Sequence, residues 1–279
     1  MTGSQGSAGS EGRAGSEGRA GSEGTEHRAA LLAQVADLIP DVGRPLLVVV
    51  DGVDGAGKTR FADELAERLA GLGRTVVRAS TDGFHHPREH RHRLGRTPES
   101  VWTRHFDYRA MRRELLDPWL RGAGAPYRTA VHDVATDEYV DSEALAVPAH
   151  GVLVVDGVFA QRPELEHVWD LAVFLDVPFD VSVSRMARRD GTVDDVADPG
   201  RRRYLDAQRI YFQTCGPREK ADLVVDNSRL DLPAIVAPPA VEDPPAGWAY
   251  DADALVRTIR LPRDAAATAA LISRLVDEA

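Results

Sequence analysis

Apolar residues in this chain gather in short continuous runs, and longer amphipathic segments separate the runs. Five runs have the length of a strand, at residues 46–51, 75–79, 152–156, 171–177 and 222–226. Helical spacing of apolar residues marks the segments 28–39, 60–72, 108–120, 179–189 and 201–214. Continuous apolar strands that alternate with helices are typical of a parallel sheet covered on both faces. The pattern therefore predicts an α/β fold, with a five-stranded parallel sheet flanked by helices on both faces.

The two ends of the chain have a different composition. The hexapeptide RAGSEG occurs twice in a row, at residues 13–18 and 19–24, and it contains no large apolar side chain. Such a segment cannot bury enough surface to offset its chain entropy, so we expect a disordered tail over residues 1–25. Residues 26–279 are expected to form a single domain. Within it, we expect residues 233–250 to be a Pro-rich excursion and a helix at about 264–277 to pack back on the sheet.

Charge and cysteine content exclude several classes of function. The 279 residues carry a formal net charge of -10, and no large block of Lys and Arg stands apart from acidic neighbours. This argues against a nucleic-acid partner. The single Cys215 excludes an internal disulfide framework. No apolar run is long enough to span a membrane and no signal peptide opens the chain, so we expect no membrane association and a cytoplasmic location.

Residues 52–59 read GVDGAGKT, which matches the phosphate-binding loop pattern G-x-x-x-x-G-K-[ST] without a mismatch. The loop follows the predicted strand 46–51 and precedes the predicted helix 60–72, which is the context this motif requires. Backbone N–H groups of such a loop surround phosphates. Lys58 would reach the β- and γ-phosphates and Thr59 would ligate Mg²⁺. The predicted ATP-binding residues here are Gly52, Val53, Asp54, Gly55, Ala56, Gly57, Lys58, Thr59 and Arg60.

Two acidic residues follow predicted strands. Asp82 comes soon after the strand 75–79, and Asp156 closes the strand 152–156. The carboxyl ends of parallel strands meet at one edge of a sheet, where ligands bind. Asp82 there could accept the proton of an attacking hydroxyl and help hold Mg²⁺, with Asp156 as the second acid near the ion. The alternative for each residue is a capping role in a turn. The predicted metal ligands are thus Thr59, Asp82 and Asp156, with Mg²⁺ as the cofactor.

Two clusters of arginine flank a polar loop near the end of the apolar pattern. Arg185, Arg188 and Arg189 lie on one predicted helix, and residues 201–203 are three arginines that open the next. Clusters of like charge facing each other repel unless an anion lies between them. ATP would supply that anion, and closure of the loop over it would exclude water. The alternative is two solvated helix faces whose arginines pair with the acids of the loop.

Several short segments together resemble the uridine kinase, phosphoribulokinase and pantothenate kinase group of small-molecule kinases. They are GVDGAGKT at 52–59, TDGFHHP at 81–87, HFDY at 105–108, VVDGVFA at 154–160 and SRMARRD at 184–190. The resemblance covers about residues 28–230 and is nearest to bacterial uridine kinase-like proteins. It implies that Asp82 is the catalytic base, that Asp107 binds sugar hydroxyls, and that Asp156 assists Mg²⁺.

The resemblance also implies a lid and an acceptor pocket. Arg185, Arg189 and Arg202 would close over the phosphates, and Tyr211 would be the tyrosine of the second lid helix. Lys58 and Arg189 would act in catalysis together with Asp82. The remaining substrate contacts implied are Phe84, Tyr127 and His132, the last two from a loose match at residues 126–133. Three features depart from the uridine kinase pattern: Asp156 stands where Glu is usual, Ile210 stands where Gln precedes the lid tyrosine, and DGFH at 82–85 is more similar to pantothenate kinases and some sugar kinases of the group.

These observations predict an ATP-dependent kinase that phosphorylates a hydroxyl of a nucleoside, first of all the 5′-hydroxyl of uridine or cytidine. Its partners would be ATP and a small-molecule acceptor. One alternative is a kinase for another small metabolite, such as pantothenate, nicotinamide riboside or a sugar. The other is a nucleotide-binding regulator without catalysis. The oligomeric state stays open.

Overall fold

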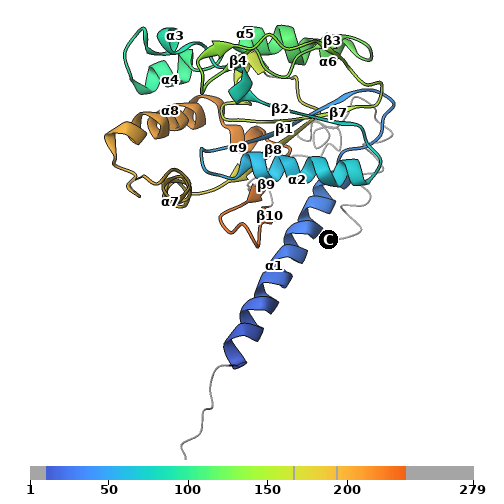
Figure 1. The fold of residues 1–279 in the computed structure, drawn as a ribbon, viewed down its shortest axis with the longest axis vertical. Coiled ribbons are helices and arrows are strands. Elements are labelled where there is room, and N and C mark those ends of the chain that lie inside the picture. Colours follow the sequence, from blue (N-terminus) through green and yellow to red (C-terminus); the bar gives the residue numbers. More distant parts are fainter. Residues whose placement is uncertain (1–10, 166, 193, 237–279) are drawn as a thin grey trace, which may run out of the picture.

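The computed structural model of the chain describes residues 11–165, 167–192 and 194–236. A six-stranded sheet lies at its centre, in the spatial order β10-β9-β8-β1-β7-β2 (Figure 1). The strands are β1 (Leu46–Gly52), β2 (Val76–Ser80), β7 (Val152–Asp156), β8 (Leu171–Asp176), β9 (Leu223–Asp226) and β10 (Ala234–Val236). All neighbouring pairs are parallel except β9 and β10, which are antiparallel. The predicted α/β class is confirmed.

The predicted number of strands is wrong by one. β10 lies in the segment expected to be a Pro-rich excursion, and it pairs with the edge of β9. A strand of three residues is too short to produce a recognisable pattern, because its register is set by the neighbour and not by its own sequence. Most of the Pro-rich segment and the helix expected at 264–277 lie outside the described residues.

Strand β1 explains how both faces of the sheet become covered. Its residues are buried without exception, and successive side chains point to opposite faces. Val48 and Val50 belong to the cluster that also contains Phe61 and Leu65 of α2 (Lys58–Gly71). The neighbouring apolar residues of β1 join the second cluster, on the other face. The sheet therefore requires a helical layer on each side, as Figure 1 shows.

Helix α1 (Glu11–Asp37) is longer than expected and replaces the disordered tail predicted for residues 11–25. Leu31, Val35 and Ile39 pack on the α2 side of the sheet. Ala, Glu and Arg of this extension favour a helix, whereas each of its glycines disfavours one by about 1 kcal/mol relative to alanine. Figure 1 shows the N-terminal half of α1 projecting away from the body of the molecule. Residues 1–10 lie outside the described residues.

Short elements cover the opposite face. They are the 3₁₀ turn Thr81–Phe84, α3 (Arg88–His92), α4 (Pro98–Arg104), α5 (Tyr108–Met111), a π-helical turn at Arg112–Leu116, α6 (Asp117–Arg121), β3 (Pro126–Tyr127), β4 (His132–Asp133), β5 (Glu138–Tyr139), β6 (Leu145–Ala146) and the 3₁₀ turn Pro163–Leu165. The predicted helix 108–120 is thus interrupted. Pro118 has no N–H and would clash with the carbonyl of Glu114, so the π turn widens the ladder at that point.

Helices α7 (Phe179–Asp190), α8 (Pro199–Cys215) and α9 (Pro217–Lys220) follow strand β8. α7 and α8 lie together at one end of the sheet, and α8 runs beneath α4 (Figure 1). They place the arginines of both predicted clusters near the carboxyl ends of the strands. Within the described ranges, no helix combines the length and hydropathy needed to cross a membrane.

Candidate active site

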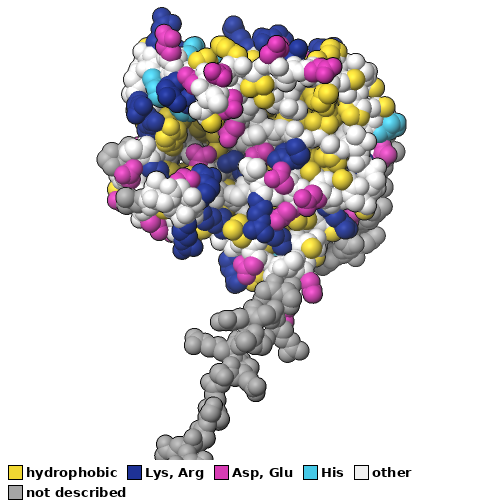
Figure 2. Space-filling model, in the orientation of Figure 1, with side chains coloured by type: hydrophobic (Ala, Val, Ile, Leu, Met, Phe, Trp, Pro, Cys, Tyr) yellow, Lys and Arg dark blue, Asp and Glu magenta, His cyan; other side chains and the backbone are white. Residues whose placement is uncertain are grey.

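A pocket of about 1170 Å³ opens at the carboxyl ends of the strands. Its walls come from the phosphate loop, from the ends of β2 and β7, and from α7 and α8. Figure 2 shows the molecule hollowed on the side where α7 and α8 lie, with Lys and Arg side chains around the hollow. Helices, loops and strands far apart in the sequence therefore meet at one cavity, as expected for a parallel sheet.

The glycines of the phosphate loop are required by close contacts. Gly55 has a φ of 79°, and a Cβ atom on it would lie 2.4 Å from the backbone oxygen of Ser182 in α7. Gly57 has a φ of 91° and is the residue that starts α2. L-residues with side chains rarely adopt such conformations. The loop can therefore lie against α7 and turn its backbone into the pocket only because these two positions are glycine.

A buried asparagine anchors the loop from behind. The Asn227 side-chain amide, just beyond β9, donates to the backbone oxygen of Ala56 at 2.7 Å. Arg28 of α1 donates in turn to the Asn227 side-chain oxygen at 3.2 Å. Asn227 is fully buried, so these bonds are shielded from water. The N-terminal helix is thereby connected to the phosphate loop.

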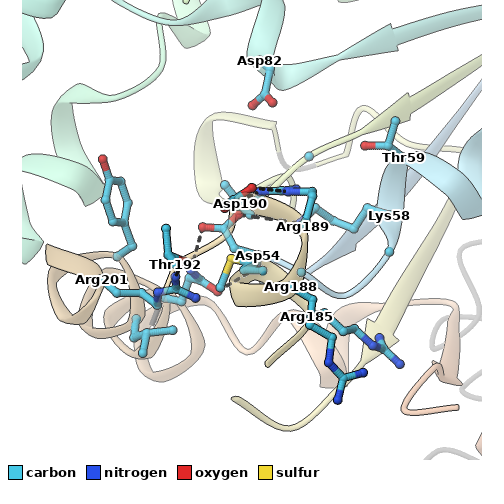
Figure 3. A pocket seen from close by; sticks show the side chains of 18 of the residues that line it. Asp54, Lys58, Thr59, Asp82, Arg185, Arg188, Arg189, Asp190, Thr192 and Arg201 are labelled. Carbon is cyan, nitrogen blue, oxygen red and sulfur yellow. Dashed lines mark hydrogen bonds and ion pairs between the residues drawn. The ribbon is translucent and has the colours of Figure 1, made fainter. Parts of the chain in front are cut away.

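Lys58 lies along the loop, with its side chain only 10 % exposed. Its ammonium group donates to the backbone oxygen of Val53 at 2.8 Å and lies 3.9 Å from the Asp54 carboxylate. Lys58 and Asp54 both line the pocket and are labelled in Figure 3. The position of the ammonium group above the loop agrees with a contact to a phosphate bound there.

Thr59 and Asp156 lie in direct contact, as the motif spacing suggests. The Thr59 hydroxyl donates to one Asp156 carboxylate oxygen at 2.7 Å. The other oxygen accepts from the guanidinium of Arg78 on β2, also at 2.7 Å. Asp156 is buried at the end of β7 and is held from both sides. Sequence reasoning missed Arg78, whose signal is a charged residue in the middle of an apolar strand.

Asp82 faces the open pocket. Its 3₁₀ turn begins just after β2, and its carboxylate makes no hydrogen bond to any residue that the structure describes. Figure 3 shows the side chain pointing into the cavity, apart from the cluster around Asp54. The pocket walls remove part of its solvation and so raise the pKa of the Asp82 carboxyl, while His85 lowers it and the Asp54 charge raises it further. Asp82 is therefore a carboxylate free to accept a proton.

Five arginines line the pocket: Arg60, Arg185, Arg188, Arg189 and Arg201. Arg189 binds Asp190 at 2.7 and 3.2 Å, and the Arg185 guanidinium donates to two backbone oxygens in the turn after β9. Arg202 lies away from the pocket, and its contact with the phosphates in a closed lid stays a prediction. Its side chain is 67 % exposed, pairs with Asp206 on the same helix and does not line the pocket. Arg60 lines the rim and pairs with Glu64.

Four predicted substrate contacts are buried in the core and do not line the pocket. They are Phe84, Tyr127, His132 and Tyr211. Phe84 and Tyr127 belong to the larger apolar cluster, and the Tyr127 ring packs against that of Trp119. His132 lies 3.4 Å from the Asp137 carboxylate. These four side chains fill the space between the sheet and the elements that cover it, and none of them faces the pocket.

Tyr211 supports the base of the phosphate loop. It is 2 % exposed, and its hydroxyl donates to the Asp51 carboxylate at 2.5 Å while accepting from the backbone N–H of Gln161 at 2.9 Å. Burial raises the pKa of Asp51, which directly precedes the loop. The tyrosine therefore supplies one of the few hydrogen bonds that stabilise this buried carboxyl group.

We expect Tyr211→Phe to lower the free energy of unfolding by about 1–3 kcal/mol, because a buried acceptor loses its donor. Urea denaturation followed by circular dichroism measures the change. Tyr139→Phe is the matched control: Tyr139 is exposed, so its loss should stay within about 0.5 kcal/mol. Unchanged stability together with a raised KM for the acceptor would instead indicate that Tyr211 contacts the substrate.

Asp107 starts helix α5. One carboxylate oxygen accepts from the backbone N–H of Ala110 at 2.9 Å, and the other lies 3.8 Å from a ring nitrogen of His86. Asp107 does not line the pocket in this structure. Its capping bond is thus certain from the geometry, whereas contact with sugar hydroxyls stays a prediction.

Two pocket residues of α8 escaped sequence reasoning. Tyr204 and Gln208 both line the cavity. Together with Tyr211 they are spaced by four and three residues, so they share the helix face that points toward the body of the molecule. That spacing was the available signal. It is weak, because many helices carry polar or aromatic residues at such positions without any role in a site.

Comparison with known proteins agrees with this geometry. A family model described as an AAA domain matches residues 48–208. A thymidylate kinase of Jannaschia sp. (strain CCS1) is 31 % identical over 163 residues, which are 56 % of this chain and 76 % of that protein. A uridine kinase of Clostridium novyi (strain NT) is 25 % identical over 193 residues, covering 65 % and 87 %.

Solved structures resemble the fold. A protein described as a possible uridine kinase from Bacillus stearothermophilus has a TM-score of 0.55 at 23 % identity, covering 71 % of this chain and 96 % of that one. The family match spans more than half of the chain and contains the phosphate loop, both pocket acids and most of the lid helices. The chain therefore belongs to the AAA-domain family of phosphate-loop proteins, and it is a kinase similar to thymidylate and uridine kinases.

Proposed function

We propose that this kinase transfers the γ-phosphate of ATP to a hydroxyl group of a nucleoside, with the 5′-hydroxyl of uridine or cytidine as the first acceptors to test. The observation that carries the proposal is the unpaired Asp82 carboxylate in the same pocket as the phosphate loop. In the reaction, the acceptor oxygen bonds to the γ-phosphorus as the bond to the β-phosphate oxygen breaks, and ADP leaves. The hydroxyl proton passes to Asp82.

The Thr59 and Asp156 side chains suit a Mg²⁺ ion. Mg²⁺ prefers oxygen ligands and in such enzymes takes one or two carboxylates together with substrate phosphates. The Thr59 hydroxyl and the Asp156 carboxylate lie 2.7 Å apart beside the loop, and Asp82 lines the same pocket. Among the described residues no group of three or more His, Cys, Asp or Glu could hold a metal alone. The ion would neutralise phosphate charge when bound.

The lid arginines supply positive charge on the side of α7 and α8. Arg188, Arg189 and Arg201 line the pocket opposite the sheet, so they could contact the phosphates of ATP from above. Guanidinium groups bind phosphate oxygens in pairs, and stabilisation of transferring phosphate is a known use of arginine. Lys58 would approach the same phosphates from the loop.

Asp82 favours an alcohol over a phosphate as the acceptor. The part of the pocket at the ends of β2 and β7 is lined by Ser80, Asp82, Gly157 and Val158, which include a carboxylate and no cation. An alcohol must lose a proton during attack and needs a base. Thymidylate, the nucleotide in the name of one relative, offers a phosphate oxygen that needs no base and that Asp82 would repel.

An acceptor screen tests the proposal. The purified chain is incubated with ATP, Mg²⁺ and one acceptor at a time, and ADP release is measured for uridine, cytidine, thymidylate, pantothenate, nicotinamide riboside and pentoses. We expect uridine or cytidine to give the highest kcat/KM. Activity with pantothenate or a sugar but with no nucleoside would move the chain to the alternative group, and a preference for thymidylate would contradict the role of Asp82.

If Asp107 binds the ribose, 2′-deoxyuridine should be a far poorer acceptor than uridine, since a carboxylate enclosed by the bound acceptor that loses a hydroxyl partner costs about 1–3 kcal/mol. That energy corresponds to roughly 5- to 150-fold in kcat/KM. Steady-state kinetics on the two nucleosides measures the ratio. Equal values would remove Asp107 from the acceptor site and leave it as the cap of α5.

The pH profile of kcat/KM follows from the raised pKa of Asp82. The base must be ionised, so activity should fall as the pH is lowered through an apparent pKa above the ordinary aspartate value of 3.8. Partial desolvation by the pocket walls is the main cause of the shift. The measurement is kcat/KM, which reports the groups of the free enzyme, across acidic pH above the range in which the chain unfolds. An unchanged rate down to pH 4 would contradict the assignment.

A further inference from the structure

Helix α8 holds the phosphate loop through a reciprocal pair of hydrogen bonds. The backbone N–H of Asp54 donates to the side-chain oxygen of Gln208 at 3.0 Å. The side-chain amide of Gln208 donates back to the Asp54 carboxylate, also at 3.0 Å. Gln208 is 2 % exposed and the Asp54 side chain is 37 % exposed, so the bonds are shielded from water on the Gln208 side.

Asp54 is an unusual neighbour for a bound phosphate. Its carboxylate lines the pocket, and its second oxygen lies 3.9 Å from the Lys58 ammonium group. The pocket is lined by Arg189 as well. Without a fixed partner, this carboxylate would turn toward the nearest cation, since charge-assisted hydrogen bonds are the strongest available to it. The long ion pair with Lys58 that the structure already contains would then shorten to a direct hydrogen bond and occupy the group that the phosphate needs.

We propose that Gln208 is a positioning residue that restrains the Asp54 carboxylate and so keeps Lys58 available to ATP. The two bonds fix both the loop backbone and the side chain, which one bond could not do. Because Gln208 lies on a buried face of a 17-residue helix, its amide is held firmly in place. The Gln208 amide donates to Oδ2 of Asp54, whereas Oδ1 is the oxygen that lies 3.9 Å from the Lys58 ammonium group. The hydrogen bond to Oδ2 therefore opposes a movement of the carboxylate toward Lys58.

The inference rests on the proposed use of ATP but not on the identity of the acceptor. ATP affinity can be measured on the full chain without any acceptor present, by titration calorimetry with Mg²⁺ and ATP. Failure of the acceptor screen therefore leaves this test intact. Failure of ATP to bind the unaltered chain would instead remove the proposed function itself.

The experiment is a double-mutant cycle with Gln208→Leu and Asp54→Asn. Gln208→Leu keeps the approximate size and removes both hydrogen bonds, so we expect the Kd for ATP to rise by about tenfold, the equivalent of one hydrogen bond to a charged group. In the Asp54→Asn background, where no charge competes for Lys58, the same change should alter the Kd by less than about threefold. The difference between the effects of Gln208→Leu in the two backgrounds is the coupling free energy between Gln208 and Asp54.

A merely structural role gives different results. If Gln208 only packs, its loss should weaken ATP binding equally in both backgrounds, and this outcome overturns the proposal, as does an unchanged Kd in the single variant. Gln213→Leu is the control, because Gln213 is exposed on the same helix. Urea denaturation checks that the variants fold. If Gln208→Leu does not fold, Gln208→Met, which is unbranched, takes its place with the same expectations.

Discussion

Lys58→Ala should reduce phosphoryl transfer by about 10²- to 10³-fold and leave the fold intact. The lysine ammonium group lies above the phosphate loop, bonded to Val53 and close to Asp54. At that place it would stabilise charge that develops on the β- and γ-phosphates, and loss of one such preorganised group costs about 3–4 kcal/mol. Since the side chain contributes one hydrogen bond to the folded chain, its removal should lower stability by only about 1 kcal/mol.

The measurement is ADP release at saturating ATP with the acceptor that the screen identifies, together with urea denaturation. Arg68→Ala on the same helix serves as the control, because Arg68 is exposed on the surface of α2. Turnover of the Lys58 variant within tenfold of the unaltered chain would contradict the role of the phosphate loop in this reaction. A large loss of stability would mean that the lysine is structural.

Asp82→Asn should lower kcat by about 10²- to 10⁴-fold while the affinity for ATP stays close to that of the unaltered chain. The amide keeps the shape of the side chain but cannot take the hydroxyl proton, and general base catalysis contributes about that much. The carboxylate makes no hydrogen bond within the described residues, so folding should not depend on it. The Asp82 carboxylate would contribute to catalysis only when an acceptor is bound.

Steady-state kinetics and ATP titration separate the possible roles. Asp141→Asn is the control, since Asp141 is an exposed residue away from the pocket. The acid limb of the pH profile should also disappear from the residual activity of the Asp82 variant. If ATP affinity collapses while transfer from bound ATP stays normal, Asp82 serves the metal ion or the loop and is not the base.

The core of the fold was predictable because its signals are local. A continuous apolar run such as β7 indicates a strand buried on both faces, whatever lies next to it, and the prediction of residues 152–156 agrees with the structure residue for residue. The phosphate loop is equally local, since its glycines are dictated by backbone angles and close contacts. That these strand ends converge on one pocket follows from parallel topology alone.

Side-chain direction on the lid helix was not predictable in the same way. Consecutive residues of a helix point about 100° apart, so a small rotation of α8 decides which one faces the cavity. Arg201 therefore lines the pocket and Arg202 faces solvent, although the sequence treats them alike. Tyr204 and Tyr211 share one face of α8, and their positions along the helix, about two turns apart, place Tyr204 in the pocket and Tyr211 in the core.

Contacts between residues that lie far apart in the sequence could not be predicted from any local sequence pattern. Asp54 and Gln208 are separated by 154 residues, and Arg78 and Asp156 by 78. The sequence by itself determined the α/β class, the phosphate loop and the acids at the strand ends, because each depends on a few neighbouring residues. The tertiary structure decided which arginines, tyrosines and amides surround that loop, because these contacts depend on how separate elements pack against one another.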